Sequence, residues 1–185
     1  GPPENKLGIR TSNTTQVIFE DVRVPARNLL GKEGDGFKIA MKTLDISRAV
    51  VGAMATGVAQ GAFEAALQYS KDRQQFGKPI CSFQGIQFIL ADMAIMCETA
   101  RLLYQKAASN QDQGLPYTKE ASLAKYWGGE AAMKVSTDAV QVFGGYGYTK
   151  EYIVEKYMRD AKIFQIFEGT AQVQKMVIAG DILRA

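Results

Sequence analysis

Residues 82–110 read SFQGIQFILADMAIMCETARLLYQKAASN, and this stretch decides the fold class. Its apolar side chains recur with the spacing of an α-helical turn, which places them on one face of a long helix. A helix with one apolar face has to bury that face against neighbouring helices. The members of this stripe are Ile86, Ile89, Leu90, Met93, Met96, Cys97, Ala100, Leu103, Tyr104 and Ala107.

Helical periodicity continues on both sides of this stretch, from about residue 36 to the carboxy end. Gly77 and Pro79 are expected to end the preceding helix, and a Gly114-Leu-Pro116 turn leads to the following one. Long helices with short connections predict a mainly α fold, an antiparallel up-and-down four-helix bundle. The predicted helices are residues 37–73, with a break considered near residues 45–48, and residues 82–110, 118–143, 151–160 and 169–183.

Small residues repeat along one side of the first predicted helix. They indicate either close approach of another helix or an exposed face used for oligomerisation, and the pattern leaves both open. The small residues are Gly52, Ala55, Ala59, Ala62 and Ala66.

The amino-terminal segment has a different pattern. Residues 16–24 are rich in β-branched side chains, partly alternate with polar ones and stop at Pro25, which predicts one or two strands. An isolated strand pair is marginally stable in water, so these strands need a sheet that the remaining sequence does not supply. We therefore expect the chain to be incomplete at its amino end.

Composition restricts the possible functions. The chain has 185 residues, 46% of them apolar and 22% charged, and it contains no histidine, which excludes histidine bases, Ser/His/Asp triads and imidazole zinc sites. Its 22 basic and 19 acidic residues are interleaved, so nucleic acid is not the expected partner. Charged or amide side chains interrupt the helical stretches, so no membrane insertion is expected. Cys81 and Cys97 are expected to be reduced thiols.

Glu168 follows an apolar stretch and precedes Gly169 and Thr170 at the predicted start of a helix. A carboxylate there is stabilised by the helix dipole by about 0.3–1 kcal/mol, which is one sufficient explanation for it. The other explanation is chemical, because proton transfer in a chain without histidine falls to a carboxylate, lysine, tyrosine or cofactor.

Three further segments have a structural explanation, and for two of them a ligand-binding explanation is also possible. The glycines of residues 141–148 suit a helix end with a tight turn, or the close approach of backbone to a phosphate. Arg73 suits a helix carboxy end, or, with Gln75 and Gln84, the binding of a diphosphate and a nucleotide. Asp45 and Arg48 have the spacing of an intrahelical ion pair.

Each signal is weak alone, but their order and spacing resemble the acyl-CoA dehydrogenase family from Lys6 to the carboxy end. The resemblance is greatest to its short- and medium-chain, butyryl-CoA dehydrogenase-like members. The motifs that carry it are Phe19-Glu-Asp-Val-Arg-Val-Pro25, Asp45-Ile-Ser-Arg48, Arg73-Gln-Gln-Phe-Gly77, Gln141-Val-Phe-Gly-Gly145, Met158-Arg-Asp160 and Glu168-Gly-Thr170.

This resemblance implies a three-domain flavoenzyme that oxidises acyl-CoA to trans-2-enoyl-CoA. Residues 1–30 would be the tail of its middle β-domain with a linker, and residues 31–185 its carboxy-terminal helical bundle. Glu168 matches the base, while Leu44, Asp45, Arg48 and Gly169 match positions along the acyl-CoA. The positions that match contacts to FAD, in part to FAD held by a neighbouring subunit, are Arg73, Gln75, Phe76, Gln84, Gln141, Gly144, Gly145, Thr170 and Gln172.

Two positions bear on the branch of the family. Phe167 stands where many relatives carry Tyr, which puts the substrate preference in doubt more than the activity. Isovaleryl and long-chain members carry their base at the position of Ser47. A serine at this position together with Glu168 indicates that the chain belongs to neither of these two branches. Short or medium straight chains are the expected substrates.

The resemblance also implies partners and a location. These are an electron-transfer flavoprotein as acceptor, a homo-oligomer (dimer or tetramer), and the cytoplasm of a prokaryote or the mitochondrial matrix of a eukaryote. Two alternatives stay open. One is a catalytically incomplete fragment that serves as an oligomerisation module, and the other is an acyl-CoA oxidase.

Overall fold

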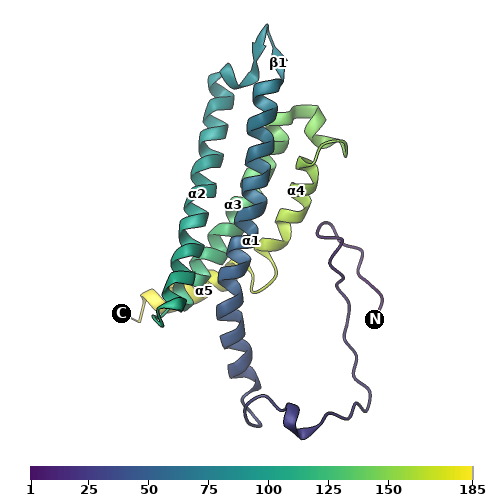
Figure 1. The fold of residues 1–185 in the computed structure, drawn as a ribbon, viewed down its shortest axis with the longest axis vertical. Helices are drawn as coiled ribbons and strands as arrows, with labels where there is room; N and C mark the ends of the chain where they lie inside the picture. Colours follow the sequence, from purple (N-terminus) through teal and green to yellow (C-terminus); the bar gives the residue numbers. More distant parts are fainter. Residues whose placement is uncertain (185) are drawn as a thin grey trace.

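The structure is a computed structural model that describes residues 1–184, and Figure 1 shows a bundle of long helices preceded by an extended segment. Short 3-10 turns lie at Ala26–Asn28, Ile80–Ser82, Gly144–Tyr148 and Lys162–Gln165. The helices and strands are α1 (Gly36–Asp72), β1 (Gln74–Gln75), β2 (Lys78–Pro79), α2 (Gln84–Asp112), α3 (Thr118–Phe143), α4 (Val154–Ala161) and α5 (Ala171–Ile182).

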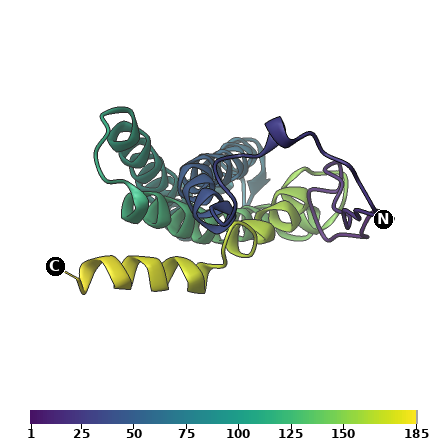
Figure 2. The ribbon, with the colours of Figure 1, turned by 90° about the horizontal axis from the view of Figure 1, so that it is seen from below.

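Helices α1 to α4 alternate in direction along the long axis, and α3 packs against α1, α2 and α4 (Figure 1). Helix α5 crosses the end of the bundle beside α3, as Figure 2 shows from below. The prediction of a mainly α, antiparallel bundle is confirmed. Helix α1 is continuous through residues 45–48, so the break considered there is absent.

Close approach of α1 to α3 forms the centre of the bundle. A Cβ built on Gly52 would lie 2.9 Å from the backbone of Ala124, and one on Gly128 would lie 2.9 Å from the carbonyl oxygen of Gly52. The small residues of α1 that follow, Ala55, Ala59, Ala62 and Ala66, are fully buried. Of the two explanations for them, close helix approach is therefore correct, and the exposed oligomer face is wrong.

By length and composition alone, α1 could cross a membrane. The central helix of a soluble bundle can have the same length and apolar composition. In this structure the small residues of α1 are buried against neighbouring helices. The notable length of α1 thus reflects its place as the helix that runs the whole height of the bundle (Figure 1).

Strands β1 and β2 form a small antiparallel hairpin at one end of the bundle. Its two turn residues, Phe76 and Gly77, both have positive φ angles, 53° and 77°, as a tight two-residue hairpin turn requires. The side chain of Phe76 is consequently 91% exposed at the tip.

Residues 16–24 contain no assigned strand, so the prediction of one or two strands there is wrong for this structure. The segment runs apart from the bundle (Figure 1). A strand is defined by the hydrogen bonds of a partner strand, and within residues 1–184 no partner lies beside this segment. A β-branched sequence alone cannot supply that partner.

The contact between α1 and α3 leads to a first prediction. Gly52→Ala should lower the free energy of unfolding by about 1–3 kcal/mol, because the new methyl group would overlap the backbone of Ala124. Gly57→Ala is the matched control on the same helix. Its methyl group would meet no atom within 4 Å, so helix propensity should raise stability by about 0.5–1 kcal/mol. Urea unfolding measures both, and equal effects would contradict this account of the helix contact.

Candidate active site

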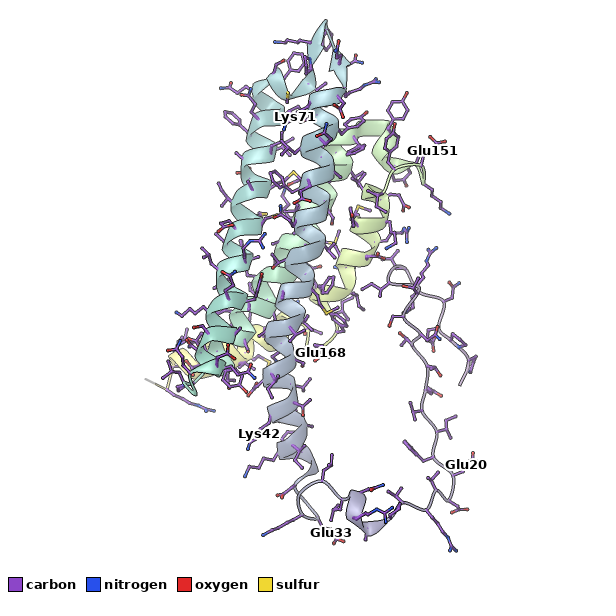
Figure 3. All side chains as sticks on the ribbon, viewed as in Figure 1. Glu20, Glu33, Lys42, Lys71, Glu151 and Glu168 are labelled. Atoms are coloured by element: carbon purple, nitrogen blue, oxygen red, sulfur yellow. The ribbon has the colours of Figure 1, made fainter. Side chains whose placement is uncertain are left out.

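Glu168 lies in a short turn between the 3-10 segment Lys162–Gln165 and the start of α5. Its φ angle is 57°, and that of Gly169 is 88°, so two successive residues adopt the left-handed region. The side chain of Thr170 then caps α5 by accepting a hydrogen bond from the backbone N–H of Val173 at 3.3 Å. The Glu168 side chain, half-buried, lies beside the lower part of α1 (Figure 3).

Ser47 of α1 contacts the Glu168 side chain directly. Its Oγ donates a hydrogen bond to Oε2 of the carboxylate at 2.7 Å. By the resemblance described above, the base lies at the position of Glu168 in some relatives and at the position of Ser47 in others. In this structure a single hydrogen bond joins these two positions. A carboxylate on either residue would reach much the same point in space.

Asp45 and Arg48 form the ion pair that their spacing indicates, with 2.9 Å between Arg48 Nη1 and Asp45 Oδ1. Thr118, at the start of α3, donates a hydrogen bond to the other carboxylate oxygen at 2.9 Å. The Arg48 side chain is buried, and its Nε has no hydrogen-bond partner among the described residues. The half-buried Leu44 lies three and four residues before Ser47 and Arg48 on α1, so these three side chains share one face of the helix.

Lys125 is a component of this region that the sequence pattern did not single out. It lies on α3, its side chain is fully buried, and its Nζ donates a hydrogen bond to the carbonyl oxygen of Gly169 at 2.6 Å. The buried amide of Gln174 donates to the same oxygen at 3.0 Å and to that of Glu168 at 3.3 Å. A signal did exist, because Lys125 has helical spacing with the small residues Ala121 and Gly128 on the buried side of α3.

Burial lowers the pKa of Lys125 from 10.5 to about 8, because removal from water disfavours the charged form. The positive charge of Arg48 lowers this pKa further, whereas Glu168 and Glu130 act in the opposite direction. The buried side chains of Lys125 and Arg48 are thus close enough to influence each other, and the charge of Glu168 also acts on Lys125.

A second group of predicted residues meets at the other end of the bundle. Arg73, Gln75, Gly144 and Gly145 line a cavity of about 530 Å³ together with aromatic side chains. The guanidinium of Arg73 lies 5.3 Å from the ring centre of Tyr146. Phe76, Gln84 and Gln141 are exposed around this end and do not line the cavity.

Thr170 and Gln172 belong instead to the end that carries Glu168, where they line a separate cavity of about 460 Å³. The uninterrupted α1 connects the two ends, from Ser47 near Glu168 to the C-cap at Arg73. At a rise of 1.5 Å per residue, this length of helix separates the two groups by about 40 Å. The predicted cofactor residues therefore form two sites and not one.

The described residues 1–184 contain no group of three His, Cys, Asp or Glu side chains that could hold a metal ion. The thiols of Cys81 and Cys97 are unpaired.

Comparisons with known proteins find a matching family model and similar structures. The family model for the carboxy-terminal domain of acyl-CoA dehydrogenases matches residues 34–183. A short-chain-specific acyl-CoA dehydrogenase of Megasphaera elsdenii is 55% identical over 100% of this chain, which spans 48% of that relative. The structure of butyryl-CoA dehydrogenase from the same organism matches with a TM-score of 0.98, at 55% identity over 100% of this chain and 48% of that one.

A further match is a structure described as electron transferring flavoprotein of Acidaminococcus fermentans, in work on flavin-based electron bifurcation. It has a TM-score of 0.98 and 54% identity, and the match covers 100% of this chain and 49% of that one. The chain thus spans about half the length of the relatives it matches.

The buried Lys125 predicts a specific pH dependence of stability. Its pKa is about 8 in the folded chain and ordinary, 10.5, in the unfolded one, so between these values the unfolded state binds more protons. The free energy of unfolding should therefore rise with pH in this window, by at most about 1.4 kcal/mol per pH unit, while the full cost of the buried charge remains below pH 8.

Urea unfolding at pH 7.5 and pH 10 tests this against Lys125→Met, in which the other titrating groups are unchanged. Wild type should gain about 1–3 kcal/mol relative to this variant across the window. Lys134→Met, which removes an exposed lysine of the same helix, should follow the wild-type profile. Parallel profiles for wild type and Lys125→Met would contradict the lowered pKa.

Proposed function

Because this chain belongs to the acyl-CoA dehydrogenase family, we propose that it is the helical domain of an enzyme that oxidises acyl-CoA to trans-2-enoyl-CoA. The observation that carries the proposal is the position of Glu168, in a left-handed turn at the start of α5 and hydrogen-bonded to Ser47. Residues 31–185 would then form the carboxy-terminal domain, and residues 1–30 would belong with a preceding β-domain.

Glu168 is assigned as the base that accepts the α-proton of the acyl thioester. An α-proton is too weakly acidic for an unassisted carboxylate, so the negative charge that develops on the thioester oxygen needs hydrogen-bond donors. The N–H groups of Glu168, Gly169 and Thr170 have no hydrogen-bond acceptor among the described residues. The start of α5, with its dipole, suits an anionic oxygen in the same place.

FAD is the cofactor that this chemistry requires, and two features of the chain fit it. Arg73 supplies a cation for a diphosphate in the cavity that it shares with Gln75. A Cβ on Gly145 would meet no atom within 4 Å and its φ angle is not positive, so neither packing nor the backbone demands glycine there, whereas a closely approaching ligand would. When bound, FAD supplies the acceptor for the hydride that leaves the β-carbon.

The distance between the two cofactor groups bears on assembly. An extended dinucleotide is shorter than the roughly 40 Å of helix between Ser47 and Arg73. Thr170 and Gln172 would therefore contact the FAD of their own active site, and the Arg73 group would contact an FAD bound mainly by another subunit. A homo-oligomer, dimer or tetramer, follows from this division.

Acyl-CoA is the proposed substrate and an electron-transfer flavoprotein the proposed acceptor, supported by the names of the Megasphaera and Acidaminococcus relatives. Short straight acyl chains are preferred on the same ground. We place the enzyme in the cytoplasm of a prokaryote or the mitochondrial matrix of a eukaryote. An oxidase would share this site and differ in how the reduced flavin meets oxygen.

The assignment of Glu168 can be tested in a protein that joins this chain to the amino-terminal half of the Megasphaera elsdenii relative. We call this the joined protein. Glu168→Gln should keep FAD and butyryl-CoA binding, because the amide has nearly the same shape, while the rate of flavin reduction falls by about 10²- to 10⁴-fold. Stopped-flow bleaching of the flavin absorbance measures this rate.

Arg73→Ala is the matched control and should behave in the opposite way, losing FAD on dialysis before it loses the rate per bound flavin. A Glu168→Gln protein that bleaches its flavin at the wild-type rate would show that another group is the base. A joined wild-type protein that stays colourless and inactive would favour the alternative of an oligomerisation module.

Self-association gives a separate prediction. Phe88, Ile95 and Leu102 are spaced seven residues apart on α2 and are 61%, 60% and 56% exposed, which is an apolar strip suited to a subunit contact. Ile95→Glu should shift the joined protein toward smaller species in sedimentation velocity. Thr137→Glu, which places the same charge on an exposed position of α3, should leave the distribution unchanged. Equal distributions for both variants would exclude this strip as the contact.

A further inference from the structure

The turn that carries Glu168 needs support from its surroundings. A residue with a side chain is strained in the left-handed region, and this conformation persists only where neighbouring groups hold it. Glu168 has a φ angle of 57°, followed by 88° at Gly169. The carbonyl groups of these two residues are therefore the natural points at which the turn could be held.

Both carbonyl groups are held by buried side chains from two different helices. Lys125 Nζ of α3 donates to Gly169 O at 2.6 Å, and Gln174 Nε2 of α5 donates to Gly169 O at 3.0 Å and to Glu168 O at 3.3 Å. Lys125 and Gln174 each have a relative exposure of 0%. These three hydrogen bonds, which we call the carbonyl clamp, attach the turn to the body of the bundle.

The use of a lysine here is energetically unusual. No carboxylate lies within ion-pair distance of Lys125 in the described part of the chain, so its buried ammonium is directed at a neutral carbonyl. Burying an ammonium group without an ion pair is strongly unfavourable, because the charge loses its hydration. If the side chain served only to fill space, methionine or leucine could be buried there without the cost of a buried charge. We therefore expect Lys125 to have a function at the turn.

The clamp also determines where the N–H groups of the turn point. In a trans peptide the C=O and N–H bonds point in opposite directions, and the described chain contains no cis peptide bond. Carbonyl oxygens of Glu168 and Gly169 that point at Lys125 and Gln174 therefore direct the N–H groups of Gly169 and Thr170 away from the bundle. Those N–H groups have no acceptor among the described residues.

We propose that Lys125 is a positioning residue which, with Gln174, clamps the Glu168–Gly169 turn so that the carboxylate faces the substrate side and the N–H groups stay free. The proposal rests on Glu168 being the base, as assigned above. Lys125 touches neither substrate nor cofactor in this role and acts through the backbone of the turn.

The kinetic test compares Lys125→Met, Gln174→Met and the double variant in the joined protein. Lys125→Met should lower the rate of flavin reduction by about a hundredfold, as expected for a misplaced reacting group, while FAD content and the KM for butyryl-CoA change less than about threefold. The double variant should be no slower than the slower single variant, because both side chains hold the same turn. Lys134→Met on the same helix should keep the wild-type rate.

A second test needs no activity and uses the chain of residues 1–185. Backbone ¹⁵N order parameters at residues 168 and 169 should fall from about 0.85 to below about 0.6 in Lys125→Met, and stay high in Lys134→Met. Unchanged order parameters would overturn the clamp.

The outcomes separate the two proposals. A wild-type rate in Lys125→Met, or a loss of rate that only follows loss of FAD, would overturn the positioning role and leave Glu168 as the base. An inactive joined wild-type protein would count against the proposed function, and the order parameters would then decide the clamp.

Discussion

The close contact between α1 and α3 is the constraint on which the other features of this domain depend. With Gly52 and Gly128 facing each other, the two backbones approach until even a methyl group would lie 2.9 Å from a main-chain atom. This approach brings Asp45 of α1 to Thr118 of α3, with which it is hydrogen-bonded, and brings Arg48 close enough to Lys125 to lower its pKa. Larger side chains at the two glycines would separate these polar groups along with the helices.

The polar groups that this contact brings together are expensive to bury. The ion pair with Asp45 offsets the cost of burying the Arg48 charge. Lys125 has only a carbonyl oxygen as an acceptor, and burial lowers the pKa of Lys125 to about 8. Proteins accept such costs mainly where geometry matters more than stability. The left-handed turn of Glu168 is the geometry that these side chains surround.

The bundle also separates its polar residues into two groups at opposite ends. Glu168, Thr170 and Gln172 lie near the start of α5, while Arg73, Gln75, Gly144 and Gly145 line a cavity beside the hairpin. The rigid α1 fixes the distance between these ends. A cofactor that needs both groups must therefore be shared between copies of the chain, which links activity to assembly in the function proposed here.

The helices could be predicted from the sequence, because their signals are local. The order of α1, α2 and α3 was predicted correctly, with small errors at the helix ends. The prediction came from the apolar stripe of residues 82–110 and from the helix-ending residues Gly77, Pro79 and Gly114. The order of motifs around Glu168 and Arg73 likewise pointed to the family. The small residues of α1 allowed two explanations, because spacing shows which residues share a face but not what covers it.

Only the tertiary structure decided what meets across the bundle. The hydrogen bond from Ser47 to Glu168 joins residues 121 positions apart, and the one from Lys125 to Gly169 joins residues 44 apart. The spacing of Lys125 with Ala121 and Gly128 placed it on the buried side of α3, but a lysine on a helix is normally exposed, and its acceptor at Gly169 is distant in sequence. Residues 16–24 were wrongly predicted as strands because the spacing of their β-branched residues is a local signal. A strand also needs a partner strand, which that signal does not report. Contacts distant in sequence depend on packing, which no single helix specifies.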